Sequence, residues 1–118
     1  MKKFLHLRIR VKDTTRTVNF YKENFNCKVV NEHTSPRGNK LTFLSLIDDI
    51  TLELCEFPKK EDFRIEDDLF HLAFSVKNMK KTYEELTKNE VKFTEGGPND
   101  TMTFIEDPDG YEIELIEK

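Results

Sequence analysis

Clustered cysteines, long apolar runs and blocks of like charge are all missing from this chain of 118 residues. The two cysteines, Cys27 and Cys55, lie far apart and form no CxxC pair, so we expect free thiols in a reducing cytosol. No segment has the apolar length that crosses a bilayer. Charged residues and a histidine interrupt the first apolar residues before the hydrophobic region of a signal peptide can form. These absences predict a cytoplasmic protein with no membrane partner.

An excess of positive charge is missing as well. The chain has 19 Lys and Arg against 23 Asp and Glu, a formal net charge of −4 at pH 7, and the two signs are interspersed. A module that binds nucleic acid needs clustered basic side chains to contact phosphates. We therefore expect a small-molecule partner and no nucleic acid. The length suits one domain, residues 1–118.

An internal repeat runs through the sequence. The segment HLRIRVKDTTRTVNFYKENF, which starts at His6, aligns with HLAFSVKNMKKTYEELTKNE, which starts at His71. Further on, LTFLSLIDDITLELCE aligns with MTFIEDPDGYEIELIE. Self-similarity of this kind indicates a duplicated structural unit. We expect two related modules, residues 4–57 and 69–118, joined by an exposed and charged linker, residues 58–68.

Each half has the pattern of a strand, a helix and three further strands. The opening strand of the first half alternates polar residues with the apolar residues Leu5, Leu7, Ile9 and Val11. Asp13 and Asn78 stand where a helix N-cap belongs. The helices that follow carry apolar residues at helical spacing: Val18, Tyr21 and Phe25, then Met79, Tyr83 and Leu86. Further strands are expected around residues 28–32 and 91–94, with hairpin turns at 47–49 and 107–110. The prediction is an α+β fold of two tandem βαβββ modules.

Alternation of side chains places two histidines and two glutamates on the strand faces that point away from the helices. In the closing strands the aliphatic residues must face the helices, so Glu53 and Glu114 point the other way. The same argument holds for His6 and His71 in the opening strands. If the sheets curl toward each other, this donor set favours Zn, Ni, Co, Fe or Mn over Ca or Mg. Taken singly, each residue is more often a surface group or a hydrogen-bonded core group than a ligand, but the recurrence of both types favours a metal.

Four stretches of the chain resemble the glyoxalase I (lactoylglutathione lyase) family of the vicinal oxygen chelate superfamily. They are FLHLRIRV with NFYKENF, ITLELCE, FHLAFSVKN and FIEDPDGYEIELIE, and they span nearly the whole length. The resemblance implies a curved mixed sheet around a metal held by His6, Glu53, His71 and Glu114, which match the family's ligand order. It also implies a homodimer whose sites can take ligands from both chains. The short chain resembles the branch that prefers Ni or Co, with Zn as the other candidate.

The resemblance implies an isomerase that converts the hemithioacetal of methylglyoxal and a thiol, with glutathione expected, to an S-lactoyl thioester. A metal stabilises the developing oxyanions, and a carboxylate moves a proton between adjacent carbons. The family pattern implies Glu114 as the base and Glu53 as its partner carboxylate. Arg10 stands where glutathione-using relatives bind the peptide carboxylate.

The sequence departs from the family where the thiol is expected to bind. Phe57, which we expect to contact the substrate, replaces an asparagine, and the loop EGGPNDT carries no basic residue. Candidates to replace the missing charge are Lys59, Lys60 and Arg64.

Several neighbouring residues admit two interpretations. Cys55 either lines the substrate cavity or is a small buried hydrophobe. Arg8 and Arg10 share the face of His6, and they either bind an anionic substrate group or pair with Glu56 or Glu112. Phe43 and Phe104 are either pocket walls or core residues, with core packing expected.

Two other functions stay open. One is that of the superfamily's dioxygenases or antibiotic-modifying thiol transferases, and this resemblance implies a metal held by two histidines and one glutamate. A fourth ligand at Glu53 counts against these two enzyme classes. Binding proteins of the bleomycin-resistance kind hold no metal and lack the ligand set, so its presence here favours an enzyme.

Overall fold

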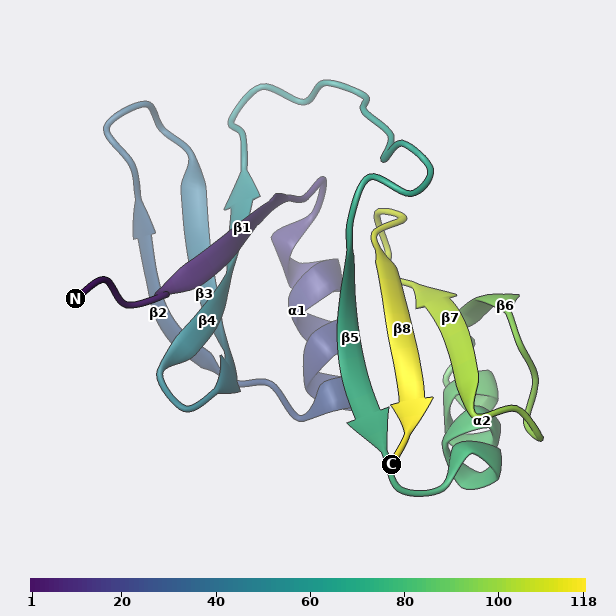
Figure 1. Ribbon diagram of the computed structural model, residues 1–118. Helices are drawn as coiled ribbons and strands as arrows, with labels where there is room; N and C mark the ends of the chain where they lie inside the picture. The colour runs from purple at the N-terminus through teal and green to yellow at the C-terminus, as the bar shows by residue number, and fades with distance from the viewer. The chain divides into compact units, whose positions relative to one another are not determined.

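The computed structural model describes residues 1–118, which form two compact units, Met1–Phe63 and Arg64–Lys118. Each unit contains one helix and a mixed sheet of four strands (Figure 1). The order of elements in each is βαβββ. The predicted α+β fold of two tandem βαβββ modules is therefore confirmed.

The first unit has the strand order β1-β4-β3-β2. Strand β1 runs parallel to β4, and the other two pairings are antiparallel. Its elements are β1 (His6–Arg10), α1 (Thr14–Phe25), β2 (Val29–Thr34), β3 (Lys40–Ile47) and β4 (Ile50–Glu56).

The second unit repeats this topology, with the strand order β5-β8-β7-β6. Strand β5 runs parallel to β8 beside it, as Figure 1 shows. Its elements are β5 (His71–Val76), α2 (Met79–Lys88), β6 (Lys92–Glu95), β7 (Met102–Glu106) and β8 (Glu112–Glu117).

Both helices begin at the predicted N-caps. The side chain of Asp13 accepts a hydrogen bond from the backbone N–H of Arg16 at 3.1 Å, and Asn78 accepts one from Lys81 at 3.0 Å. These caps satisfy N–H groups that have no partner inside the helix. Neither helix has the length and apolar character needed to cross a membrane.

A glutamate at the end of each closing strand binds the start of the helix in its own module. Glu56 Oε1 accepts from the backbone N–H of Thr14 at 2.7 Å, and Glu117 Oε2 accepts from the backbone N–H of Met79 at 2.8 Å. Anions are favoured at helix N-termini, where the helix dipole is positive. The repeat thus extends to a carboxylate that ties the last strand to the helix.

Each unit buries its own aliphatic core. Ile9, Leu52 and Leu54 are buried in the first, and Ile113 and Leu115 in the second. The prediction for Leu5 was wrong: it precedes β1 and is 61% exposed. The predicted linker, 58–68, forms no helix or strand, and the boundary between the units follows Phe63 within it.

The motif DPDGY closes the hairpin between β7 and β8. Asp107 Oδ1 accepts hydrogen bonds from the backbone N–H groups of Asp109, Gly110 and Tyr111 at 2.9, 3.1 and 3.0 Å. Gly110 has φ of +100°, a conformation that L side chains rarely adopt. The order of residues in this motif therefore follows from the geometry of the turn.

Candidate functional site

His6 and Glu53 form a pair on adjacent parallel strands of the first unit. The register of β1 and β4 aligns His6 with Thr51 and Arg8 with Glu53. Alternation of side chains then places His6 and Glu53 on one face as diagonal neighbours. His6 Nε2 lies 3.3 Å from Glu53 Oε1, and the Glu53 side chain is 3% exposed.

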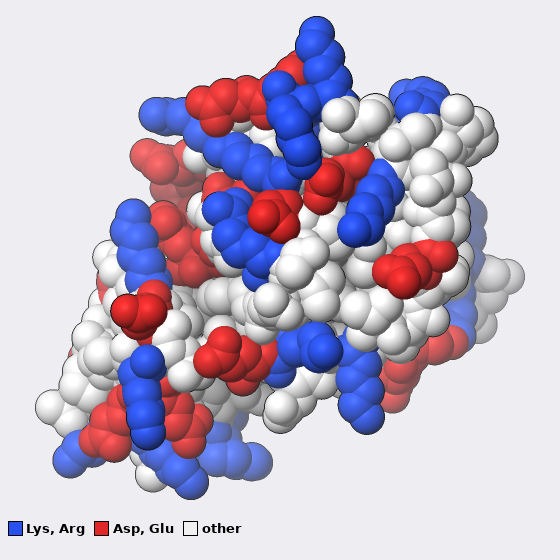
Figure 2. All heavy atoms as spheres, turned by 180° about the vertical axis from the view of Figure 1, so that it is seen from behind, with Lys and Arg blue, Asp and Glu red and all other residues white.

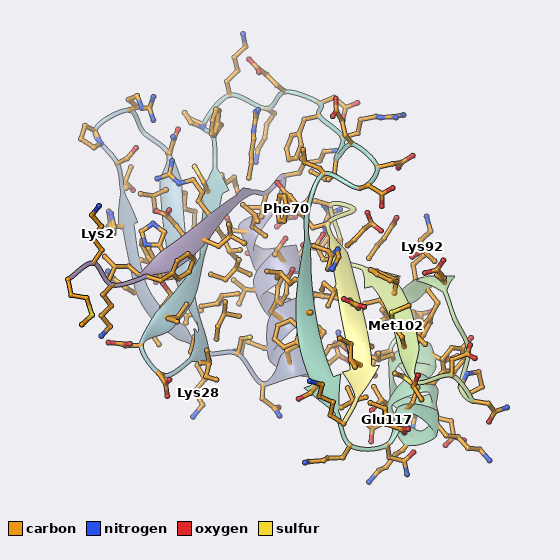
Figure 3. The ribbon with its side chains drawn as sticks, viewed as in Figure 1. Lys2, Lys28, Phe70, Lys92, Met102 and Glu117 are labelled. Atoms are coloured by element: carbon orange, nitrogen blue, oxygen red, sulfur yellow. The ribbon has the colours of Figure 1, made fainter.

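His71 and Glu114 form the matching pair in the second unit. The register of β5 and β8 aligns His71 with Glu112 and Ala73 with Glu114, as in the first unit. His71 Nε2 lies 3.1 Å from Glu114 Oε1, and the Glu114 side chain is 16% exposed. His71 follows directly after Phe70, which Figure 3 labels at the start of β5. The duplicated sequence thus builds the same contact twice.

A phenylalanine from the neighbouring strand packs against each imidazole. Phe43 lies opposite Glu53 in the sheet register, and Phe104 lies opposite Glu114. The ring centroids of Phe43 and His6 are 5.5 Å apart with planes at 80°, and those of Phe104 and His71 are 5.3 Å apart at 89°. Edge-to-face contacts of this kind hold an aromatic ring in a defined orientation. The expectation of core packing was incomplete, since both rings are half-buried and face the histidines.

Arg8 distinguishes the first pair from the second. Its Nε donates to Glu53 Oε1 at 2.8 Å and its Nη2 donates to Glu53 Oε2 at 3.2 Å, a two-point contact. The hydrogen bond with Glu53 raises the pKa of Arg8. Of the two interpretations of Arg8, pairing with a carboxylate holds, but the partner is Glu53 and not Glu56 or Glu112. Ala73 occupies the matching place in the second unit, so Glu114 has no such partner.

Arg10 and Phe57, both predicted to contact substrate, lie together in a pocket of about 260 Å³ within the first unit. The Arg10 guanidinium carbon lies 4.0 Å from the centroid of the Phe57 ring and 4.7 Å from that of Phe63. Its Nη2 is 3.8 Å from Glu61 Oε2. Aromatic rings attract a guanidinium placed over their faces, so the two phenylalanines hold Arg10 in the pocket.

The other basic residues of this pocket are paired with carboxylates. Lys12 Nζ lies 3.1 Å from Asp62, and Lys60 Nζ lies 2.8 Å from Glu56. Lys59 contacts Glu61 at 3.5 Å. Two of the three residues considered as replacements for the missing loop charge, Lys59 and Lys60, therefore line one pocket with Arg10. The third, Arg64, lines a different pocket, in the second unit.

Both cysteines are free, as predicted, and both are buried. The Cys55 side chain is 1% exposed, which favours a packing role over substrate contact. Burial raises the pKa of the Cys27 thiol. Figure 2 shows Lys and Arg interspersed with Asp and Glu over the face that it displays.

The two pairs fit the chemistry of a divalent transition metal. Imidazole nitrogen and carboxylate oxygen bind such metals at about 2.0–2.2 Å, which puts adjacent ligand atoms roughly 3 Å apart. The pairs have separations of 3.3 and 3.1 Å. No third His, Cys, Asp or Glu completes either pair into a larger metal-binding group. Each unit therefore holds one histidine and one glutamate that could bind a metal.

The profile of the Glyoxalase/Bleomycin resistance protein/Dioxygenase superfamily matches residues 3–115. Lactoylglutathione lyase of Salmonella typhimurium is 31% identical over 124 residues, covering 98% of this chain and 92% of that protein. Glyoxalase I of Saccharomyces cerevisiae is 35% identical over 142 residues, covering 94% of this chain and 43% of that protein.

Solved structures show the same likeness. The trypanothione-dependent glyoxalase I of Leishmania major has a TM-score of 0.88 at 29% identity, covering 99% of this chain and 87% of that one. Glyoxalase I of Zea mays has a TM-score of 0.83 at 28% identity, and the match covers 98% of this chain and 44% of that one. A fosfomycin resistance protein of Listeria monocytogenes, with a TM-score of 0.77 at 20% identity, shares the fold.

Proposed function

Because the chain belongs to the Glyoxalase/Bleomycin resistance protein/Dioxygenase superfamily, we propose that it is a metal-dependent isomerase of the glyoxalase I type. It is an enzyme similar to lactoylglutathione lyase. The proposed reaction converts the hemithioacetal of methylglyoxal and a thiol to an S-lactoyl thioester. The duplicated contact between a histidine and a glutamate, one per unit at 3.3 and 3.1 Å, is the observation that supports it most.

The proposed metal ligands are His6, Glu53, His71 and Glu114. Ni or Co is the preferred ion and Zn the other candidate, since imidazole and carboxylate donors suit all three. When bound, the metal supplies Lewis-acid stabilisation of the oxyanions formed in the reaction. The protein's own residues orient the substrate and move the proton.

Glu114 is the proposed base. It takes the proton from the carbon that carries the sulfur and returns it to the adjacent carbon. The hydroxyl proton of the first carbon moves to the carbonyl oxygen of the second, so no group leaves and the carbon skeleton is unchanged. Glu53 is less suited to this task because both of its oxygens already accept hydrogen bonds from Arg8. Glu114 contacts His71 and no arginine or lysine, so its carboxylate has free lone pairs to accept a proton.

Arg10 is the proposed binding residue for a carboxylate of the thiol, with glutathione as the first candidate. Phe57 supports the Arg10 guanidinium from one side. Its contact with Glu61 is long, at 3.8 Å, and Glu61 is half exposed, so this surface pair is weak and a substrate carboxylate can replace it. Lys59 and Lys60 add positive charge to the same pocket.

We also propose a cytoplasmic homodimer. Two buried free thiols suit a reducing compartment. Sedimentation equilibrium of the purified protein tests the dimer, and a mass equal to that of one chain at micromolar concentration would reject it.

The reaction is tested with protein loaded with Ni²⁺ or Co²⁺, methylglyoxal, and a panel of thiols that includes glutathione. We expect formation of the thioester, followed by its ultraviolet absorbance. Glu114→Gln should lower kcat by at least about 100-fold, since general base catalysis contributes factors of this size. Glu84→Gln, an exposed residue of α2, is the matched control and should retain full activity.

Two results would contradict the proposal in different ways. Full activity in Glu114→Gln would remove Glu114 from the role of base. Inactivity of metal-loaded protein with every thiol would favour a dioxygenase or a thiol transferase instead.

A further inference from the structure

The contact between Arg8 and Glu53 breaks the symmetry of the two pairs. Both pairs have the same register, the same imidazole contact and the same phenylalanine. Only Glu53 has a guanidinium on both oxygens, because the repeat places Ala73 opposite Glu114. The presence of a guanidinium on one glutamate and not on the other therefore comes from the side chain at one position and not from a difference in strand pairing.

The geometry of this contact fixes the plane of the Glu53 carboxylate. The last torsion of a glutamate side chain is broad, so an unrestrained carboxylate samples many orientations. Two parallel hydrogen bonds from the planar guanidinium, at 2.8 and 3.2 Å, remove that freedom. In the fixed orientation Glu53 Oε1 lies 3.3 Å from His6 Nε2, which suits two adjacent ligands of one ion.

Burial strengthens this restraint. Glu53 is 3% exposed, whereas the Arg8 side chain is 47% exposed and is reached from solvent. A buried carboxylate without a partner is strongly unfavourable. Arg8 therefore compensates the charge of Glu53 before any metal binds, and it does so without blocking all four lone-pair positions of the carboxylate.

We infer that Arg8 is a positioning residue that makes the two glutamates unequal. It fixes Glu53 as a ligand of constant orientation, and it leaves Glu114 free to turn between the two carbons that exchange a proton. This inference rests on the proposed function. Arg8 itself contacts neither the substrate nor the reacting atoms in this assignment.

Three substitutions test the inference. Arg8→Met removes both donors and keeps the apolar stem, and Arg8→Lys keeps the charge but offers only a single-point donor. Ala73→Arg adds a guanidinium opposite Glu114. Arg37→Met, an exposed residue of the loop between β2 and β3, is the matched control.

The first measurement is the affinity for Co²⁺, titrated into metal-free protein and followed by visible absorption, with no substrate present. We expect Arg8→Met to bind Co²⁺ about 10- to 100-fold more weakly than the unsubstituted protein, as for other losses of an outer-shell partner. Arg8→Lys should recover only part of that affinity. Arg37→Met should bind normally.

The second measurement separates kcat from KM. Ala73→Arg should lower kcat at a nearly unchanged KM, because Glu114 is then held in one orientation. Thermal unfolding followed by circular dichroism identifies variants that fail to fold. If Arg8→Met is one of them, Arg8→Lys decides the inference, since it keeps the compensating charge.

The inference and the proposed function fail in different ways. If the unsubstituted protein does not bind Co²⁺, the proposed function is overturned and the inference falls with it. If it binds Co²⁺ and both Arg8 variants bind with the same affinity or more tightly, the inference alone is overturned. Unchanged kcat in a folded Ala73→Arg protein would reject the role assigned to the freedom of Glu114.

Discussion

Glu53 and Glu56 lie three residues apart on β4, and different groups engage their carboxylates. Glu53 accepts from Arg8, whereas Glu56 accepts from the backbone N–H and the hydroxyl of Thr14, both at 2.7 Å, and from Lys60 at 2.8 Å. Partial burial on its own would raise the pKa of Glu56, but the hydrogen bonds from Lys60 and Thr14 outweigh it and lower the pKa to about 2. Two glutamates of β4 thus have separate tasks: Glu53 belongs to the candidate site, and Glu56 binds the start of α1.

The pKa of Glu56 predicts how stability depends on pH. The folded value of about 2 lies below the ordinary value of 4.5, so the carboxylate stabilises the fold above pH 4.5 and this contribution is lost as the pH falls from about 4.5 to about 2. Glu56→Gln should lower the free energy of unfolding at neutral pH by about 1–3 kcal/mol. The free energy of unfolding of this variant should also decrease less than that of the unsubstituted protein between pH 4.5 and about pH 2.

Urea denaturation at a series of pH values measures both effects. Glu32→Gln, an exposed residue of β2, is the control and should follow the unsubstituted protein. Parallel stability curves for the Glu56→Gln variant and the unsubstituted protein would contradict this account.

The sequence indicated which residues share a face but not which residues face each other. Alternation put His6, Arg8 and Glu53 on one side of the strands, and the structure brings them into contact. Alternation also puts Glu56 on the opposite face of β4 from Glu53, the face toward the helix, so Glu56 could have been excluded as the partner of Arg8 from the sequence alone. That Arg8 lies opposite Glu53 depends on the register between β1 and β4. Register between distant strands is set by tertiary packing. The metal and base roles of the pairs remain predictions.

Among the elements, the hairpin turns show how the repeat tolerates local differences. The turn between β3 and β4 is short, with Asp48 at φ of 50°. The turn between β7 and β8 is longer, and Asp107 organises it by accepting three backbone N–H groups. Both turns were predicted from their residues. Strand ends were less accurate: the strand expected over 28–32 is β2, which ends at Thr34, because pairing with β3 extends it beyond its apolar residues.

Asp107 should be critical for the hairpin that carries Glu114. Asp107→Ala removes an acceptor from three buried or half-buried N–H groups, so it should lower the free energy of unfolding by about 2–3 kcal/mol. Asp107→Asn keeps a carbonyl oxygen in the same place and should cost less. Chemical denaturation measures both variants.

Asp100→Ala supplies the comparison, because Asp100 accepts only one exposed hydrogen bond, from Gly97. A loss for Asp107→Ala no greater than that for Asp100→Ala would show that the motif is not what holds the turn.

For the whole molecule, the main feature is that each of the two units holds one contact between a histidine and a glutamate. Unit Met1–Phe63 holds His6 and Glu53, and unit Arg64–Lys118 holds His71 and Glu114. Two donors alone bind a divalent metal weakly. The proposed four-ligand site therefore requires both units to act on one ion.

Metal stoichiometry tests this requirement. We expect one Co²⁺ per chain, and a rise in the melting temperature when Co²⁺ is added to metal-free protein, since a ligand that binds only the folded state stabilises it. His6→Gln and His71→Gln, one substitution in each unit, should each abolish both effects. His33→Gln, the remaining histidine, should leave both unchanged.

Two independent sites would give a different pattern. Each single variant would then lose about half of the bound metal and keep the other half. That result would end the four-ligand proposal while leaving the fold and the family assignment intact.

The arginine opposite Glu53 and the alanine opposite Glu114 mean that the halves of this duplication are no longer interchangeable. A chain fused from two copies of the first module would carry a guanidinium on both carboxylates, and one fused from two copies of the second would carry none. In this chain the order of the two modules therefore decides which of the two carboxylates carries a guanidinium.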